Sequence, residues 1–169
     1  AVVAGATAVY SVGTGPEGGN QGSNSPEPAP RTTPLGFTGR QFDKFKRGAR
    51  RLVRRAELPE GELVAHGSRI KGTARNASDI DIALRVDETT FFDLAEKALS
   101  RARPGTRLRE TMLRRIRQNG QLSSFDLGPE FQALRRELLD ANSPVPVQFS
   151  VIKIGGKLDT GPFLSLGNP

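Results

Sequence analysis

The 169-residue sequence has no cysteine and no tryptophan, and it has only one histidine, one tyrosine and one methionine. Without cysteine, this chain forms no disulfide framework, no Cys-ligated zinc site and no thiol nucleophile. Its one histidine, His66, also excludes a multi-histidine zinc site. Acidic residues are in deficit, because 25 lysines and arginines face 18 aspartates and glutamates, for a formal net charge of +7. Such a basic chain favours an anionic partner: a nucleotide, a nucleic acid or an acidic surface.

Long hydrophobic runs are also missing. The apolar stretch at residues 1–10 is much shorter than the roughly 18 residues that a membrane-spanning helix needs, and it lacks the positive segment of a signal peptide. We therefore expect no membrane span. The sequence starts at Ala1 rather than at a methionine, and we expect it to be a piece of a longer polypeptide. A processed or trimmed start is the alternative.

Glycine, proline and small polar residues crowd the stretch from residue 11 to residue 37. This composition offers too little apolar surface to repay the entropy of ordering the chain. We therefore predict a Gly/Pro-rich lead-in and disordered linker over residues 1–37, and one folded domain over residues 38–169.

Hydrophobic periodicity within the predicted domain indicates one helix, two strands, further helices and a last strand, in that order. In the helix predicted over residues 87–103, the side chains expected to face inward are Phe92, Ala95, Leu99 and Ala102. The order of elements predicts a mixed α/β or α+β domain. The predicted helices cover residues 39–56, 87–103, 106–119 and 128–143, and the predicted strands cover residues 63–66, 79–86 and 145–154.

Two aspartates, Asp79 and Asp81, stand two positions apart in the strand predicted over residues 79–86. Their side chains therefore project from one face, with α-carbons about 6.6 Å apart. Two carboxylates this close repel each other and favour a divalent cation, and Mg²⁺ is typically held by one or two carboxylates plus substrate phosphates. We predict that both aspartates are metal ligands and catalytic residues. The alternative is a pair of solvated acids on an edge strand.

A second cluster begins one loop upstream, where the strand predicted over residues 63–66 ends. A glycine there lets the backbone approach a phosphate, and a hydroxyl can bond to its oxygens; a plain turn is the alternative. Basic side chains in the loop would offset triphosphate charge. His66 is predicted to pack against or position this loop rather than to act as a base. The predicted nucleotide-binding residues are Gly67, Ser68, Arg69, Lys71 and Ser78.

The pattern Gly67-Ser68, then Gly72, then Ser78-Asp79-Ile80-Asp81 resembles the signature of the DNA polymerase beta-like nucleotidyltransferase superfamily. The resemblance implies an α+β fold, with a small mixed β-sheet and helices packed on one face. It also implies transfer of a nucleoside monophosphate from a nucleoside triphosphate to a hydroxyl, dependent on Mg²⁺ or Mn²⁺, with release of pyrophosphate.

One position departs from that signature. The superfamily usually supplies a third carboxylate from a later strand, and here Gln148 and Ser150 occupy the corresponding face. Glutamine can bind a metal through its carbonyl oxygen but is neutral and a poor general base. A catalytically inactive nucleotide- or RNA-binding module is therefore the alternative to an active enzyme.

Two predicted helices carry positive charge on one side with almost no acidic neighbours: residues 40–55 contain only Asp43, and residues 101–118 only Glu110. Such a face is either a solvated surface or a contact for the phosphates of an acceptor RNA, such as a tRNA end. A protein hydroxyl is the other acceptor considered. The predicted acceptor-binding residues are Arg50, Arg51, Arg54, Arg55, Arg114, Arg115 and Arg117.

The layout, with a Gly-rich lead-in and a Pro/Gly linker before a compact enzyme, resembles the tip of a polymorphic toxin of the Rhs or contact-dependent type. This resemblance implies delivery into a recipient cell, action in its cytoplasm, and a cognate immunity protein as a partner. A housekeeping or antitoxin-type minimal nucleotidyltransferase that modifies a protein is the alternative.

Overall fold

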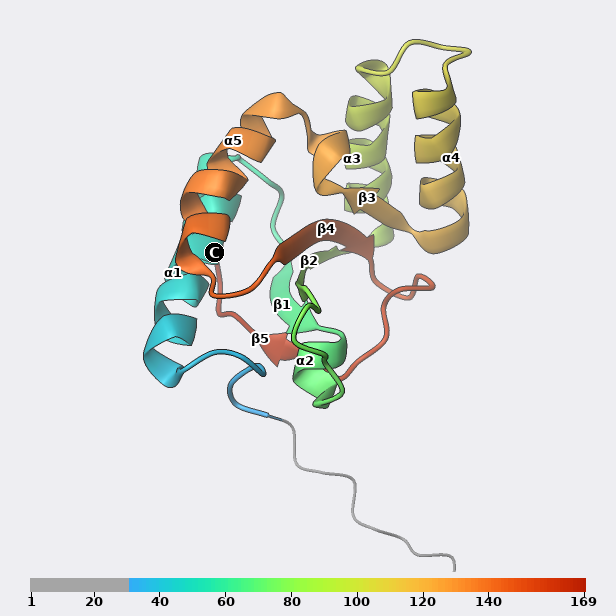
Figure 1. Ribbon diagram of the computed structural model, residues 1–169. Helices are drawn as coiled ribbons and strands as arrows, with labels where there is room; N and C mark the ends of the chain where they lie inside the picture. The colour runs from blue at the N-terminus through green and yellow to red at the C-terminus, as the bar shows by residue number, and fades with distance from the viewer. Residues whose placement is uncertain (1–30) are drawn as a thin grey trace, which may run out of the picture.

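A five-stranded mixed sheet forms the centre of the molecule in the computed structural model, which describes residues 31–169 (Figure 1). The strand order is β3-β4-β2-β1-β5. Strands β2 and β4 are parallel and the other neighbouring pairs are antiparallel, so the predicted mixed sheet is confirmed. The strands are β1 (Glu62–His66), β2 (Ile80–Val86), β3 (Gln121–Ser123), β4 (Val147–Lys153) and β5 (Leu164–Ser165).

The helices cover one face of this sheet. Helices α1 and α5 lie side by side, and α3 and α4 form a second pair (Figure 1). Phe45 of α1, Phe91 of α3 and Phe131 of α5 enter one core with the strand residues Ile82 and Phe149. Packing of helices on one face, as predicted, is therefore confirmed. The helices are α1 (Gly39–Arg55), α2 (Ser68–Lys71), α3 (Glu88–Ser100), α4 (Arg107–Asn119) and α5 (Pro129–Leu138), with short 3-10 turns η1 (Ser124–Leu127) and η2 (Asp140–Asn142).

The start of α1 defines where the described fold begins. Thr38 caps the helix, since its hydroxyl accepts from the backbone N–H of Gln41 at 3.2 Å and the Gln41 side chain accepts from the N–H of Thr38 at 2.9 Å. Packing continues upstream of the helix. The N–H of Leu35 donates to the Arg69 carbonyl at 3.1 Å, and the centres of the Phe37 and Phe45 rings lie 5.3 Å apart. Residues 34–37 of the predicted linker thus pack on the domain, while its part up to residue 30 lies outside the described residues.

The opposite face of the sheet is covered in part by the chain that follows β4. Leu158 and Phe163 pack there on a small apolar cluster formed by Val64, Ala83 and Ile152. This packing leaves the rest of the face to polar side chains.

Arg85 of β2 holds that C-terminal segment in place. Its Nε donates to Asp159 at 2.6 Å, a second ion pair joins it to Glu62, and its guanidinium lies 4.3 Å from the centre of the Phe163 ring. Because Asp159 is almost fully buried in this pair, the segment has a fixed position beside the cavity described below.

One residue of the inward set predicted for helix α3 is exposed. Phe91 is buried, and Phe92, expected inside, is 46% exposed. Ala95 and Ala102 lie in the core as predicted, and Leu99 packs against it. The spacing of Phe91 with Ala95, Ala98 and Ala102 is also helical, so the core receives Phe91 in place of Phe92.

Within the described part of the chain, no helix combines the length and apolar character that crossing a membrane requires.

Candidate active site

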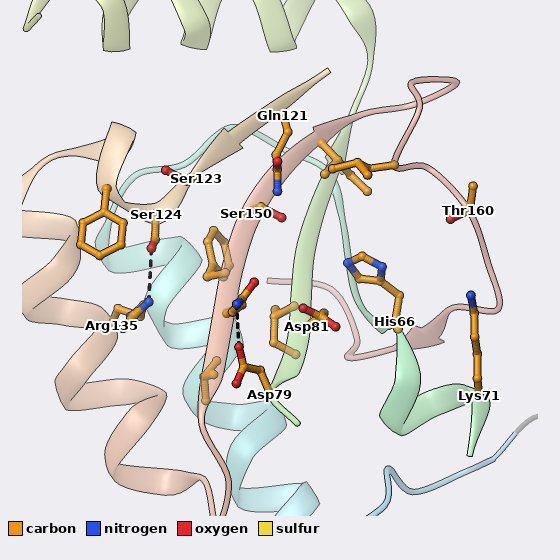
Figure 2. Close-up of a pocket in the computed structure, with 18 residues that line it drawn as sticks. His66, Lys71, Asp79, Asp81, Gln121, Ser123, Ser124, Arg135, Ser150 and Thr160 are labelled. Atoms are coloured by element: carbon orange, nitrogen blue, oxygen red, sulfur yellow. Dashed lines mark hydrogen bonds between the residues drawn. The ribbon is translucent and has the colours of Figure 1, made fainter. Parts of the chain in front are cut away.

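A cavity of about 670 Å³ opens between the sheet face that carries the aspartates and the edge formed by η1 and α5 (Figure 2). Of the predicted site residues, the cavity wall contains Gly67, Lys71, Asp79, Asp81 and Gln148. Figure 2 places the two aspartates in the middle, with His66 and Lys71 on one side and Ser124 and Arg135 on the other. The structure therefore brings together the residues on which the predicted chemistry depends.

The polar centre of the cavity is a row across three neighbouring strands. His66 of β1 pairs in register with Asp81 of β2, which pairs with Gln148 of β4. Asp79 precedes Asp81 by two residues, and its Oδ2 accepts from Gln148 Nε2 at 2.6 Å. The position of the third acid is thus occupied by an amide that binds one of the two carboxylates.

Burial controls the protonation of two members of this row. Partial burial raises the pKa of Asp81, and the nearby Asp79 raises it further, whereas His66 opposes the shift. Burial lowers the pKa of His66 against the pull of Asp81, and Lys71 adds to the lowering. His66 is therefore uncharged at neutral pH and contributes no positive charge to the site.

Gly67 turns the chain from β1 into α2 at a point where only glycine fits. Its φ is +80° with ψ −160°, a combination that essentially only glycine adopts. A β-carbon there would come well inside 3.0 Å of Asp81 Oδ2, closer than real β-carbons approach other atoms. The glycine therefore makes room for the carboxylate.

Arg69 and Ser78, both predicted to contact the nucleotide, form hydrogen bonds within and beside the loop. Arg69 is buried, and its guanidinium donates to the carbonyl oxygens of Leu35 at 2.7 Å, Asn76 at 3.2 Å and Ser78 at 2.9 Å. The Ser78 hydroxyl accepts from the N–H of Arg75 at 2.9 Å. Neither residue belongs to the cavity wall, and neither does Ser68. Arg69 and Ser78 thus shape the loop that leads to the aspartates.

Asp79 and Asp81 are the residues able to hold a divalent cation. They offer oxygen donors only, the type that Mg²⁺ and Mn²⁺ prefer. Within residues 31–169, no group of three or more His, Asp or Glu side chains is placed to hold a metal ion. The donor set fits a cation that completes its coordination with water and substrate phosphates.

Three residues at the end of the cavity away from His66 and Lys71 were not predicted from the sequence. Ser124 and Phe125 come from η1 and Arg135 from α5. The signal available was weak, because a phenylalanine in a short polar stretch between two helices is read as part of a connection. Only the curl of the chain from β3 through η1 into α5 brings these residues to the cavity.

The seven arginines predicted to bind an acceptor fall into two groups. Arg50 donates to the Leu166 carbonyl at 2.7 Å, Arg55 pairs with Glu137 at 3.1 Å, and Arg115 pairs with Asp126 at 3.2 Å. These three are engaged within the fold. The other four are exposed and form no ion pair within the described residues: Arg51, Arg54, Arg114 and Arg117.

Comparison with known families matches residues 44–127 to the family model described as Nucleotidyltransferase domain. The matched segment includes Gly67, Asp79 and Asp81, and it ends before Gln148. The match supports the superfamily indicated by the sequence pattern. No curated protein and no solved structure matches the chain.

Proposed function

We propose that this chain, which carries a nucleotidyltransferase domain at residues 44–127, transfers a nucleoside monophosphate from a nucleoside triphosphate to a hydroxyl of an RNA acceptor. The acceptor oxygen bonds to the α-phosphorus, the bond from that phosphorus to its bridging oxygen breaks, and pyrophosphate leaves with the electron pair. The hydroxyl proton passes to water. The observation that carries the proposal is the placement of Asp79 and Asp81 together in the middle of the cavity.

Asp79 and Asp81 would hold Mg²⁺ or Mn²⁺. Bound there, the cation would polarise the phosphate oxygens and offset charge that develops on them. The chain supports this role by orientation: Gly67 leaves room for the Asp81 carboxylate, and Gln148 fixes Asp79 through its amide. Neither carboxylate is used in an ion pair within the described residues, so both remain available to a cation.

The triphosphate would lie toward Lys71. This lysine lines the cavity, is exposed, and forms no ion pair with any described residue. A mobile ammonium is suited to neutralise phosphate as a point charge. With His66 uncharged beside it, Lys71 is the cation at this end of the cavity.

The exposed arginines favour RNA over a protein as the acceptor. Arg51 and Arg54 on α1, with Arg114 and Arg117 on α4, carry charge that the fold does not neutralise. Phosphate groups along a nucleic-acid backbone would supply the counter-charge and release bound ions. A protein acceptor supplies no such regular array.

We also propose that the chain acts as a toxin domain in the cytoplasm of a recipient cell, restrained there by a cognate immunity protein. This role is supported by the Gly/Pro-rich composition of residues 11–37 ahead of an enzymatic domain. Expression of the chain in a bacterial cytoplasm should arrest growth, and the Asp79→Asn/Asp81→Asn variant should relieve the arrest at an equal protein level. Equal arrest by both forms would contradict a toxin role based on transfer.

A catalytically inactive binding module is the second candidate, favoured by Gln148 in the place of an acid. Incubation of the purified chain with each labelled nucleoside triphosphate, Mg²⁺ and total RNA or protein extract separates the two candidates. We expect label in RNA, and we expect Asp79→Asn to abolish the incorporation. An Asp93→Asn variant, altered at an exposed acid on α3 outside the cavity, should keep full activity. A wild-type protein that binds nucleotide but transfers no label would support the inactive module.

A further inference from the structure

Phe125 is an exposed aromatic ring on the wall of the cavity. It is 78% exposed, the most of any large hydrophobic side chain in the described part of the chain, and it lines the cavity with Ser124 and Arg135. These two neighbours lie on the side of the aspartates opposite to His66 and Lys71 (Figure 2). The cavity therefore has an aromatic end and a cationic end.

The turn that carries Phe125 is anchored by its neighbours, so the backbone presents the ring at this place on the cavity wall. Residues on both sides are buried: Ser124 is 4% exposed and Asp126 is 6% exposed. The Asp126 carboxylate accepts from the N–H of Ser123 at 2.8 Å and pairs with Arg115 at 3.2 Å. A ring held this way binds a flat partner with little loss of conformational entropy.

At the aromatic end of the cavity, the charge of Arg135 is already balanced by an acidic side chain. Arg135 donates to Ser124 Oγ at 3.2 Å and pairs with Asp140 at 3.2 Å. Its Nε–H is buried and has no hydrogen-bond partner among the described residues. The aromatic end thus suits a neutral, flat group with polar edges better than a phosphate.

In-line displacement assigns the two ends to the two reactants. The attacking and leaving oxygens stand on opposite sides of the α-phosphorus. If the triphosphate leaves its pyrophosphate toward Lys71, the acceptor hydroxyl must enter from the side of Ser124, Phe125 and Arg135.

We infer that Phe125 is a stacking platform for the terminal nucleobase of the RNA acceptor, with Ser124 and Arg135 beside it as polar contacts. The inference rests on the proposed transfer to RNA and adds the contact that receives the RNA end. Single-stranded RNA is commonly bound by aromatic rings next to a basic surface. The Arg115–Asp126 pair joins the turn of Phe125 to α4, the helix that carries the exposed Arg114 and Arg117.

The test is a double-mutant cycle, in which the Phe125 ring and the 3′-terminal base of the RNA are removed separately and together. A single-stranded RNA of about ten nucleotides, labelled at its 5′ end, is compared with the same RNA made abasic at its 3′-terminal residue. Fluorescence anisotropy without nucleotide measures the binding of both to the wild type and to Phe125→Ala. Each single change should weaken binding by about 5- to 150-fold, because one stacked base is worth about 1–3 kcal/mol. The double change should weaken it no further.

Three further measurements make the result specific. Phe125→Trp should restore the affinity. Phe92→Ala, which removes another exposed ring on α3 outside this cavity, should bind like the wild type. The affinity for nucleoside triphosphate should be the same in Phe125→Ala and in the wild type.

The inference is overturned if Phe125→Ala binds RNA as well as the wild type, if the effects of ring and base simply add, or if nucleotide affinity falls instead. These outcomes leave the proposed function intact when the wild type still transfers label to RNA. Transfer of label to protein alone, with no RNA binding, would overturn both.

Discussion

Gly67 and Asp81 are in such close contact that the glycine can carry no side chain. Gly67 directly follows β1, and Asp81 lies in the adjacent β2, where it pairs in register with His66. A β-carbon on Gly67 would collide with Asp81 Oδ2. A glycine before a phosphate-binding loop is usually explained by the approach of the phosphate. Here the carboxylate also requires it, because a larger residue would displace the group that is proposed to hold the cation.

We predict that Gly67→Ala abolishes transfer and destabilises the fold. The backbone conformation of Gly67 is unfavourable for other residues by about 1–3 kcal/mol, and the clash adds displacement of Asp81. Urea denaturation measures the loss of stability, and label transfer measures the loss of activity. Gly105→Ala is the matched control, because Gly105 also has a positive φ of +76° but has open space around it. An active Gly67→Ala protein would show that Asp81 need not keep its position.

The order of helices and strands could be predicted because each long element carries a clear hydrophobic period. Helix α1 begins and ends within one residue of its predicted limits. Strand β2 begins one residue later than predicted and ends at the predicted residue. The short strands β3 and β5 have three and two residues, too few to show any periodicity. Phe92 of α3 was wrongly predicted to face inward because Phe91 and Phe92 both fit a helical stripe, and only packing against the sheet decides between them.

The site was predictable where the motif alone fixes position. Asp79 and Asp81 share a face because residues two apart in a strand always do. The sequence gives no sign that Arg69 would be buried and spend its donors on backbone carbonyls, since loop arginines are usually solvated. Phe125 and Arg135 reach the cavity only through tertiary structure, which no local pattern encodes.

The Arg85–Asp159 pair should make stability depend on pH. Hydrogen bonds from Arg85 hold the pKa of Asp159 below its usual range. A carboxyl with a lowered pKa stabilises the fold above the pKa of the unfolded chain, near 4, and this contribution is lost as the pH falls through the lowered value. Asp159→Asn should therefore destabilise the protein at pH 7 by about 1–2 kcal/mol, and the difference from the wild type should shrink toward pH 2.

Urea denaturation at both pH values measures this dependence. Asp43→Asn is the control, because Asp43 also has a lowered pKa from its pairing with Lys46 but lies on the exposed surface of α1, where ion pairs contribute little. A destabilisation in Asp159→Asn that is equal at pH 7 and pH 2 would mean that altered packing, not charge, causes it.

Gln148→Glu should strengthen metal binding and weaken the metal-free protein. The amide of Gln148 now donates to Asp79 at 2.6 Å, and a glutamate there would place two carboxylates in contact. Like charges about 4 Å apart repel by about 1–4 kcal/mol near a protein surface, so the metal-free variant should unfold at lower urea. With Mn²⁺, titration calorimetry should show affinity at least about tenfold higher, since tenfold requires only 1.4 kcal/mol.

Gln121→Glu is the control for that substitution, because Gln121 also lines the cavity but has no hydrogen bond to Asp79. It should change Mn²⁺ affinity much less. Unchanged affinity in Gln148→Glu would mean that residue 148 does not reach the bound cation.

The exposed arginines should control RNA affinity, and the engaged ones should control stability. Reversing Arg51, Arg54, Arg114 and Arg117 to Glu removes cations that the fold does not use. RNA affinity should fall, and the slope of log affinity against log salt should flatten by about 0.7 for each phosphate that an arginine no longer neutralises.

Arg115→Ala is the contrasting variant, because it leaves the Asp126 carboxylate, whose side chain is only 2% exposed, without its cation. It should lower stability by about 1–3 kcal/mol. Fluorescence anisotropy across a salt series and urea denaturation separate the two effects. An RNA affinity that ignores both the salt and the four reversals would make the acceptor a protein and these arginines a solvated surface.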